Sequence, residues 1–408
     1  MRVLLSDGSG LTARQVATQL SIAGHVVEVL TPDPLALTRF TRHVRRVHRV
    51  PPFGSEPFAW LDAAIAVYRA GGFDVLFPTQ EQVAILSRAG HRLHEARVAT
   101  AVPPFEALVK VQDKLAARAT LSEIGLPQPD ASVVLSAVEL AAWRRLPAFV
   151  KVPIGTATTG VRYVGEPAEM AAVASAWEAA GLFADGGVLV QSPVAGPLAM
   201  IQAVFCDGAL VASHANVRVR EGASGGASHK QSIDLPATRE HLAVLGQQLG
   251  WHGAVSADAI LTSDGPVYID INPRLVEPGN AWRSGVDLVA AMLELATGKT
   301  AVVQLPGQAG VATHQLLLAV LGAAQHAHTR RAVFAELASA SRHRGSYQDS
   351  VEELTPLRHD LRAAIPLVAA SLATLARPGT WRWFSSGAVT SYALTPGGWR
   401  EILRGPAH

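Results

Sequence analysis

Cysteine is nearly absent from this chain of 408 residues, since Cys206 is the only one. A single cysteine excludes an intrachain disulfide, a CxxC redox pair and a thiolate zinc cluster. Apolar runs of the roughly 20 residues that cross a membrane are also lacking, and Asp7 interrupts the amino-terminal segment before a signal-peptide core could form. We therefore expect a cytoplasmic protein without a membrane partner.

An excess of charge of either sign is lacking as well. The 35 basic and 33 acidic side chains leave a formal net charge of +2, which argues against nucleic acid as the main partner. Charged residues make up 17% of the chain and hydrophobic residues 49%, which excludes an intrinsically disordered protein. The length predicts two to three domains. We expect small-molecule substrates, and the candidate assembly is a homodimer.

Lysine is scarce, so each lysine is a candidate for a specific role. The lysines stand at positions 110, 114, 151, 230 and 299. Arginine, by contrast, is dense over residues 39–49 (RFTRHVRRVHR). This segment fits a phosphate or nucleic-acid patch, but the small net charge of the chain favours a solvated face or a connecting strand.

The first hundred residues alternate short apolar runs with helical patterns, which is typical of a parallel sheet covered by helices. The predicted strands are residues 3–5, 26–30 and 75–77, and the predicted helices are residues 12–22 and a helix from about residue 80. Pro103 and Pro104 mark a boundary. The pattern predicts a Rossmann-like domain over residues 1–103.

The rest of the chain is predicted to contain a strand-rich part and a helical part. A helix over residues 105–124 should end at Gly125. Strand patterns follow at residues 148–152, 188–191, 200–205, 209–213, 257–261 and 267–271. Residues 310–377 are helical in pattern, and residues 381–403 indicate a short strand pair and a final helix. The fold class is therefore α/β, with an α+β central part and a mostly helical C-terminal region with short strands.

A glycine motif near the amino terminus suggests one nucleotide site. Gly8, Gly10 and Ala13 form a G-x-G-x-x-A string between a predicted strand and helix, and Glu28 lies near the end of the next strand. This is the context of the dinucleotide-binding fingerprint. The motif is permissive, and a tight strand-to-helix turn is the simpler interpretation. An NAD-dependent oxidoreductase remains the alternative function.

A second glycine segment follows Lys151, which ends an apolar strand. Residues 155–160 have the G-x-x-x-x-G spacing, but Val161 and Arg162 stand where a P-loop has Lys and Ser or Thr. Backbone N–H groups and threonine hydroxyls can still donate to phosphate oxygens beside Lys151. The alternatives are therefore another kind of phosphate-binding loop and an ordinary β-turn.

The most informative segment is a predicted hairpin around Asp264-Gly265, a strong turn signal. Asp258 and Asp270 should lie on its two adjacent antiparallel strands. Asn272, two residues beyond Asp270, shares the face of that carboxylate. Three hard oxygen donors on one side of a hairpin suit Mg²⁺. Arg274 can bring its planar guanidinium to a carboxylate or phosphoryl group there.

The order of these motifs resembles that of the ATP-grasp enzymes, most closely the carboxylate-amine ligases and the carbamoyl-phosphate-synthetase-like branch. Asp113-Lys114 comes first, followed by Lys151 with its Gly/Thr loop, then Val-Leu-Val-Gln191-Ser-Pro-Val-Ala-Gly196, and finally Asp258 with Asp-Ile-Asn-Pro-Arg274. The resemblance covers about residues 1–300. It implies an ATP-grasp domain over residues 104–300, with a lid lobe at about 125–187 and a metal-binding lobe at about 188–300, before a C-terminal region at 301–408.

The resemblance implies a ligase that joins a small carboxylate to an amine through an acylphosphate, with ATP and Mg²⁺. The residues it implies for ATP binding are Lys114, Lys151, Gly155, Thr158, Thr159, Gly160, Gln191, Ser192 and Val194. The implied metal ligands are Asp258, Asp270 and Asn272. Arg274 and Arg220 would be catalytic, and the substrate would meet Glu277, Asn280, Arg283 and Arg218.

Three positions depart from the family pattern. Ser192 replaces an acidic residue, Leu198 replaces a glutamate that often meets the ribose, and Asp270 replaces a glutamate. Loss of the ribose contact should weaken ATP binding by about 1–2 kcal/mol. A third interpretation is therefore a catalytically weakened, nucleotide-binding accessory protein. His229 and Lys230 are expected on a flexible loop, with exposed charge.

Overall fold

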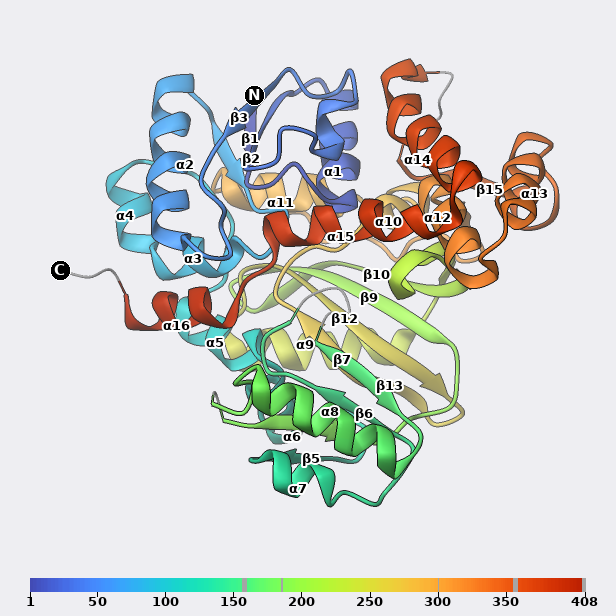
Figure 1. Ribbon diagram of the computed structural model, residues 1–408. Helices are drawn as coiled ribbons and strands as arrows, with labels where there is room; N and C mark the ends of the chain where they lie inside the picture. The colour runs from blue at the N-terminus through green and yellow to red at the C-terminus, as the bar shows by residue number, and fades with distance from the viewer. Residues whose placement is uncertain (156–159, 185, 300, 355–358, 406–408) are drawn as a thin grey trace.

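The computed structural model describes residues 1–155, 160–184, 186–299, 301–354 and 359–405. It contains three sheets, which lie one below another in Figure 1. A four-stranded sheet near the amino terminus is at the top, a seven-stranded sheet is in the middle, and a second four-stranded sheet is at the bottom. The mixed α/β class predicted from the sequence is thus observed.

The amino-terminal sheet has the strand order β3-β2-β1-β4, and all its neighbours are parallel. Its strands are β1 (Arg2–Leu5), β2 (Val26–Thr31), β3 (Arg46–Arg49) and β4 (Val75–Phe77). The helices of this part are α1 (Leu11–Ile22), α2 (Pro57–Gly71), α3 (Val83–Arg88) and α4 (Gly90–Glu95). The strands predicted at 3–5, 26–30 and 75–77 are therefore present.

The seven-stranded sheet has the order β13-β12-β9-β10-β11-β14-β15. Its strands are β9 (Leu198–Cys206), β10 (Ala209–Glu221), β11 (Ala227–Ile233), β12 (Gly253–Thr262), β13 (Gly265–Asn272), β14 (Ala312–His314) and β15 (Ser350–Glu352). Two helices lie against it, α9 (Pro236–Leu249) and α11 (Leu288–Ala296). Because α11 also contacts α1 and β4, it joins this sheet to the amino-terminal sheet in one apolar core.

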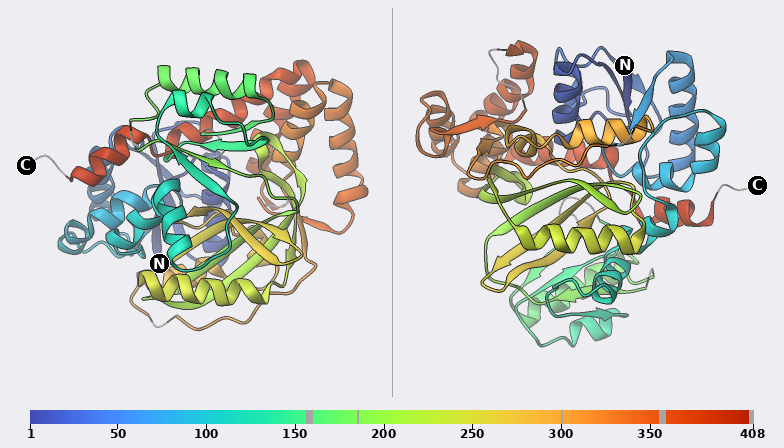
Figure 2. Two further views of the ribbon diagram at one scale, coloured as in Figure 1. Left: turned by 90° about the horizontal axis from the view of Figure 1, so that it is seen from below. Right: turned by 180° about the vertical axis from the view of Figure 1, so that it is seen from behind.

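The second four-stranded sheet has the order β5-β8-β6-β7 and is antiparallel. Its strands are β5 (Ala131–Val134), β6 (Ala148–Lys151), β7 (Val161–Val164) and β8 (Val188–Gln191). Helices α7 (Ala137–Ala141) and α8 (Pro167–Ala179) complete a separate small core with it. This unit lies at the bottom of Figure 1, below the seven-stranded sheet, and at the bottom of the view from behind in Figure 2.

The helix predicted over residues 105–124 is two helices, α5 (Phe105–Gln112) and α6 (Lys114–Glu123). Asp113 has an extended backbone between them, and its Oδ1 accepts hydrogen bonds from the N–H groups of Leu115 and Ala116 at 2.9 and 2.8 Å. The carboxylate therefore caps α6, which a continuous helical pattern did not predict.

The C-terminal part is largely helical, but its strands are not where they were predicted. Helix α15 (Trp381–Tyr392) stands in place of the predicted strand pair, whereas the predicted final helix is present as α16 (Pro396–Arg404). The short strands are instead β14 and β15, which extend the seven-stranded sheet. The other helices are α10 (Gly279–Arg283), α12 (Leu316–Ala327), α13 (Arg330–Ser341) and α14 (Ala364–Ala376). Among the helices described, none has the length and apolar character needed to cross a membrane.

Candidate active site

The predicted hairpin is present, and it brings the two carboxylates together. Strands β12 and β13 are antiparallel, and Asp258 is the register partner of Asp270. Asn272 pairs with Ser256 two positions along the same ladder, so its side chain lies on the face of Asp270. A register shift follows Asp258, as in a β-bulge, which local patterning had not indicated. The prediction of a shared face for the three oxygen donors is therefore consistent with the strand register.

Burial and mutual repulsion shape the electrostatics of this pair. The pKa of Asp258 is raised to about 7, chiefly by burial and then by the charge of Asp270. The positive charges of Lys151, Arg274 and Arg218 act in the opposite direction. Two carboxylates that face each other at a partly buried position, with oxygen atoms as the only donors, are the kind of site that a divalent cation stabilises.

Two lysines from other elements reach the same place. Lys114, the first residue of α6, has its Nζ 3.9 Å from Asp270 Oδ1, and that Nζ donates to the carbonyl oxygen of Gly155 at 3.0 Å. Lys151 ends β6 and is buried, and its Nζ donates to the carbonyl of Ile269 on β13 at 2.8 Å. Burial lowers the pKa of Lys151, while the charges of Asp270 and Asp258 oppose that shift. Two of the five lysines therefore converge on β13.

The base of the glycine and threonine loop is closed by its own backbone. The N–H of Val152 donates to the carbonyl of Gly160 at 2.9 Å, and a Cβ on Gly160 would lie 2.2 Å from Val152 Cγ2. Glycine is thus required at position 160 by this close approach. Thr158 and Thr159 lie outside the described residues, so their predicted contact with phosphate stays a prediction.

The segment after β8 borders the same region. Gln191 is the last residue of β8 and is buried, whereas Ser192 is exposed. The N–H of Ser192 donates to the carbonyl of Asp130 at 2.8 Å, which holds the start of the segment. The N–H of Val194 has no acceptor among the residues described, so it is available to a ligand.

Arg274 is held by an acidic residue that the sequence did not single out. Its Nε donates to Glu81 Oε1 at 3.1 Å, and both side chains are buried. The charges of Arg274 and Glu81 also act on Tyr392, whose pKa is raised mainly by burial. Tyr392 ends α15, which crosses between the amino-terminal sheet and the seven-stranded sheet (Figure 1). The C-terminal helices thus contribute to the surroundings of Arg274.

Glu277, predicted to meet the substrate, belongs to a buried ionic group. Its Oε2 accepts hydrogen bonds from Lys230 Nζ and Gln315 Nε2, each at 2.5 Å. Lys230 Nζ also lies 3.0 Å from Glu353 Oε2, and Gln315 donates to the same oxygen at 2.8 Å. The expectation of an exposed Lys230 on a flexible loop is wrong: Lys230 lies in β11 and is 2% exposed, because two carboxylates stabilise its charge in the interior.

The other residues predicted to meet the substrate differ in burial and in hydrogen-bond partners. Asn280 is fully buried, and its Oδ1 lies 2.8 Å from His214 Nε2. Arg283 is exposed and stacks over Trp282. Arg218 donates to the carbonyl of Gly225 at 2.8 Å.

Arg220 forms an ion pair with a carboxylate outside the hairpin. It makes a two-point ion pair with Glu336 of α13, whose Oε1 also accepts from Tyr347. Among the described residues, no hydrogen bond or ion pair links Arg220 to Asp258 or Asp270. The charge of Arg218, by contrast, acts to lower the pKa of Asp258.

The glycine motif of the alternative function has its donors already occupied. The carboxylate of Asp7 accepts from the N–H groups of Ser9 and Gly10 at 2.8 and 3.2 Å and from the Ser9 hydroxyl at 2.6 Å. Burial raises the pKa of Asp7 to about 6, although these hydrogen bonds oppose the shift. Glu28, the predicted ribose ligand, is buried and paired with Arg2 and His48. The arrangement therefore does not favour a dinucleotide there.

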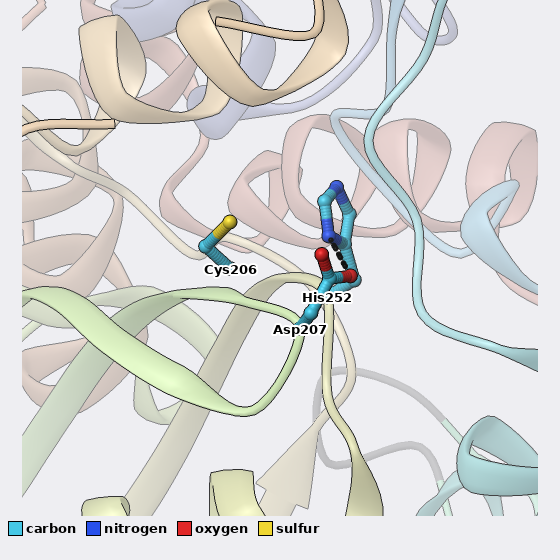
Figure 3. Close-up of side chains that lie close together, drawn as sticks. All are labelled: Cys206, Asp207 and His252. Atoms are coloured by element: carbon cyan, nitrogen blue, oxygen red, sulfur yellow. Dashed lines mark hydrogen bonds and ion pairs between the residues drawn. The ribbon is translucent and has the colours of Figure 1, made fainter. Parts of the chain in front are cut away.

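A separate group of potential ligands lies at the far end of the same strands. Cys206, Asp207 and His252 have ligand atoms within 4.8 Å of one another, the one such group of Cys, His or acidic side chains in the described part of the chain. Figure 3 shows the ring of His252 beside the carboxylate of Asp207, with His252 Nδ1 2.9 Å from Asp207 Oδ1. Gly253 pairs with Phe205 at this end, whereas Asp258 pairs with Met200, so the group is not part of the carboxylate site.

No protein-family model matches the sequence, and no curated protein matches it. Solved structures do match. The biotin carboxylase of Campylobacter jejuni in a β-γ-ATP complex has a TM-score of 0.59 at 19% identity, over 75% of this chain and 72% of that one. The biotin carboxylase domain dimer of Hydrogenobacter thermophilus 2-oxoglutarate carboxylase, with MgADP, ADP and bicarbonate, has a TM-score of 0.60 at 16% identity, over 76% of this chain and 73% of that one.

The structure of a longer protein also matches this chain. Rhizobium etli pyruvate carboxylase has a TM-score of 0.57 at 19% identity, over 74% of this chain and 29% of that chain. Biotin carboxylases are ATP-grasp enzymes. At these identities the likeness shows the fold, and this chain therefore has the ATP-grasp fold.

Proposed function

We propose that this protein is an ATP-dependent ligase that joins a small carboxylate to an amine through an acylphosphate and releases ADP and phosphate. The observation that carries the proposal is that two lysines reach β13 of the β12–β13 hairpin, where two carboxylates face each other, in a chain with the ATP-grasp fold. Structures of the same fold were solved with a β-γ-ATP complex and with MgADP, which supports ATP and Mg²⁺ as the ligands of this chain.

The donor set fits a magnesium ion. Asp258, Asp270 and Asn272 offer oxygen ligands, and the pKa of Asp258 is raised first by burial and then by repulsion from Asp270, which a divalent cation would relieve. Bound there, Mg²⁺ would supply positive charge beside the phosphates of ATP. Lys114 and Lys151 would contact the phosphate oxygens, with Gly155 and Gly160 at the base of the covering loop. We propose that the Val194 N–H and the Ser192 carbonyl meet the adenine beside Gln191.

The chemistry then proceeds in two steps. An oxygen of the substrate carboxylate attacks the γ-phosphorus of ATP, the bond from that phosphorus to the bridging oxygen breaks, and ADP leaves. The amine nitrogen attacks the acyl carbon, phosphate leaves, and the amine loses a proton to solvent. Arg274, fixed by Glu81, would stabilise the oxyanion of the tetrahedral intermediate, and positioning supplies most of the rate enhancement.

A second candidate is bicarbonate activation, because the Hydrogenobacter domain was solved with bicarbonate. The test therefore uses the full chain with ATP, Mg²⁺ and two sets of substrates. One set pairs amino acids as acids and amines, and the other pairs bicarbonate with biotin. We expect ADP and phosphate to form only with an acid and an amine present, together with a product whose mass is their sum less one water.

Three other outcomes of this test would contradict the proposed ligase activity. ATP binding without turnover in any arm would indicate the accessory protein, and carboxylated biotin would establish the second candidate. Absence of ATP binding would overturn the proposal.

Lys151→Met should weaken ATP binding about tenfold or more, because a buried charge-assisted contact to phosphate is lost. Lys110→Met, at an exposed lysine of α5, is the matched control and should bind ATP normally.

For the assembly, we propose a homodimer, as the Hydrogenobacter domain is described as a dimer. Light scattering at micromolar concentration would show twice the chain mass, and a monomer at all concentrations would contradict it.

A further inference from the structure

A cavity at the edge of the amino-terminal sheet is lined mainly by arginine. It has a volume of about 460 Å³ and lies far along the chain from the carboxylate hairpin. Five of its lining residues are arginines, namely Arg39, Arg45, Arg46, Arg49 and Arg362. Four of them come from the basic segment at residues 39–49, which the ligase chemistry does not use. The cavity is large enough for a small organic or inorganic anion.

The charge of this cavity is not balanced by the protein. All five arginines are exposed, and within the described ranges none forms an ion pair. Asp33 is the one acidic side chain in the lining, and its Oδ1 is occupied by the N–H of Leu35 at 2.8 Å. Arginines elsewhere in the chain do form ion pairs with carboxylates: Arg239 pairs with Asp234, and Arg92 pairs with Asp62. Five like charges around one space repel one another, and a bound anion would relieve that repulsion.

The backbone that carries these arginines is firmly held. Strand β3 pairs in parallel with β2, with Arg46 opposite Glu28 and Arg49 opposite Thr31. The N–H of Arg45 donates to the carbonyl of Val27 at 2.8 Å, just before the strand begins. The Arg39 guanidinium is oriented as well, because it donates to the carbonyl of Pro34 at 2.8 Å. The carboxyl end of β2 opens toward the cavity through Thr31, the place where open α/β sheets bind ligands.

The fifth arginine is brought in by the C-terminal part. Asp360 is buried, and its Oδ2 accepts from the Thr41 hydroxyl at 2.5 Å and from the Arg42 N–H at 3.1 Å. Its other oxygen accepts from the N–H of Arg362 at 3.2 Å. One carboxylate thus ties the basic segment to the segment that carries Arg362, across more than 300 positions of the sequence. Figure 1 shows α14, which follows Arg362, beside α1 of the amino-terminal part.

We infer that this cavity is a binding site for a small oligophosphate, a molecule that carries two or three linked phosphate groups. Guanidinium groups bind phosphate in a bidentate manner, and five arginines around one cavity match several linked phosphates. The cavity volume of about 460 Å³ and the near-neutral charge of the whole chain favour a small anion over nucleic acid. The site uses β2, β3 and residue 362, so it is distinct from the carboxylate hairpin and does not depend on the proposed ligase activity.

The test is calorimetric titration of inorganic triphosphate into the full chain without Mg²⁺ or nucleotide, with Lys151→Met present in every protein compared so that the proposed ATP site is weakened. We expect one triphosphate per chain with a dissociation constant below about 100 μM. The double variant Arg45→Ala, Arg49→Ala should bind at least about tenfold more weakly, because two charge-assisted contacts are lost. Arg239→Ala, at an exposed arginine outside the cavity, should bind like the parent protein.

Three results would overturn the inference. They are the absence of saturable binding, equal affinity in the parent and the double variant, and tighter arginine-dependent binding of a single-stranded oligonucleotide than of triphosphate. Thermal unfolding of the double variant shows whether it is folded. Should it be unfolded, Arg362→Ala replaces it, because that side chain is exposed and only the backbone at residue 362 is held by Asp360.

Discussion

The carboxylate of Asp258 is unfavourable in the isolated protein but well suited to bind a cation. Its carboxylate faces Asp270 across the hairpin, where burial and like charge raise its pKa to about 7. Burial and the charge of Asp270 disfavour the ionised form there, although the charges of Lys151, Arg274 and Arg218 favour it. A residue that is costly to the isolated protein and suited to a cation is a candidate for function before structure.

Asp258→Asn should separate these two effects. At pH 8 and without Mg²⁺, we expect the variant to be at least as stable as the parent in urea unfolding, because a disfavoured carboxylate becomes a neutral amide. Magnesium-dependent phosphate release should fall by about a hundredfold or more, because one charged ligand is lost. Full phosphate release in a folded variant would contradict the metal assignment. Asp264→Asn, in the exposed turn of the same hairpin, is the matched control.

At the level of elements, strand β10 is joined to helix α10 through two buried side chains. His214 on β10 lies 2.8 Å from Asn280 on α10, whose Nδ2 donates in turn to Thr313 of β14 at 2.8 Å. Burial lowers the pKa of His214 to about 4, and the charge of Lys230 acts in the same direction. The neutral imidazole is therefore the form that the fold requires.

This shift predicts a loss of stability in acid. Below pH 6.5 the unfolded chain binds a proton at His214 that the folded chain resists until about pH 4, so the free energy of unfolding falls as the pH falls through this window. In His214→Gln, which keeps a side-chain donor for Asn280, the fall between pH 7.5 and 4.5 should be smaller by roughly 2–3 kcal/mol. Urea unfolding of both proteins at the two pH values measures this. Parallel losses in parent and variant would refute it.

For the whole molecule, the ionic group around Lys230 joins three parts of the chain. Lys230 lies in β11 and Glu277 follows β13, while Glu353 comes from the segment after β15. Gln15 of α1 donates to Glu353 Oε2 at 3.0 Å, which adds the amino-terminal part. A single buried cation therefore holds two carboxylates that come from distant segments.

Lys230→Met should destabilise the whole protein by about 3–5 kcal/mol, because it leaves buried carboxylates without their cation. Unfolding in urea at pH 8 gives this value. Adding Glu353→Gln to the variant should restore part of the loss, since one uncompensated charge is removed. The idea fails if the single variant is as stable as the parent, or if the second change destabilises the protein further.

Prediction from the sequence succeeded where the signal was local. The placement of Asp258 and Asp270 on two adjacent antiparallel strands followed from the hairpin signal, and the strand pairing confirms it, whereas their direct pairing depends on the register shift after Asp258. The break at Asp113 was missed because the helical pattern continues through it, while the carboxylate is recognised as a cap only from its hydrogen bonds. The strand pair predicted in residues 381–403 was wrong for a related reason: a short apolar segment is compatible with helix or strand until its packing is known.

The residue order alone determined that this chain folds as a mixed α/β protein with oxygen donors and lysines for one site, because turns, alternation and side-chain chemistry act within a few positions. Tertiary structure alone decided that Glu81 meets Arg274, 193 positions away, and that Asp360 meets Thr41, 319 positions away. It also decided that Lys230 is buried and that Arg362 joins four other arginines around one cavity. Such contacts depend on how whole elements pack, which no short stretch of sequence specifies.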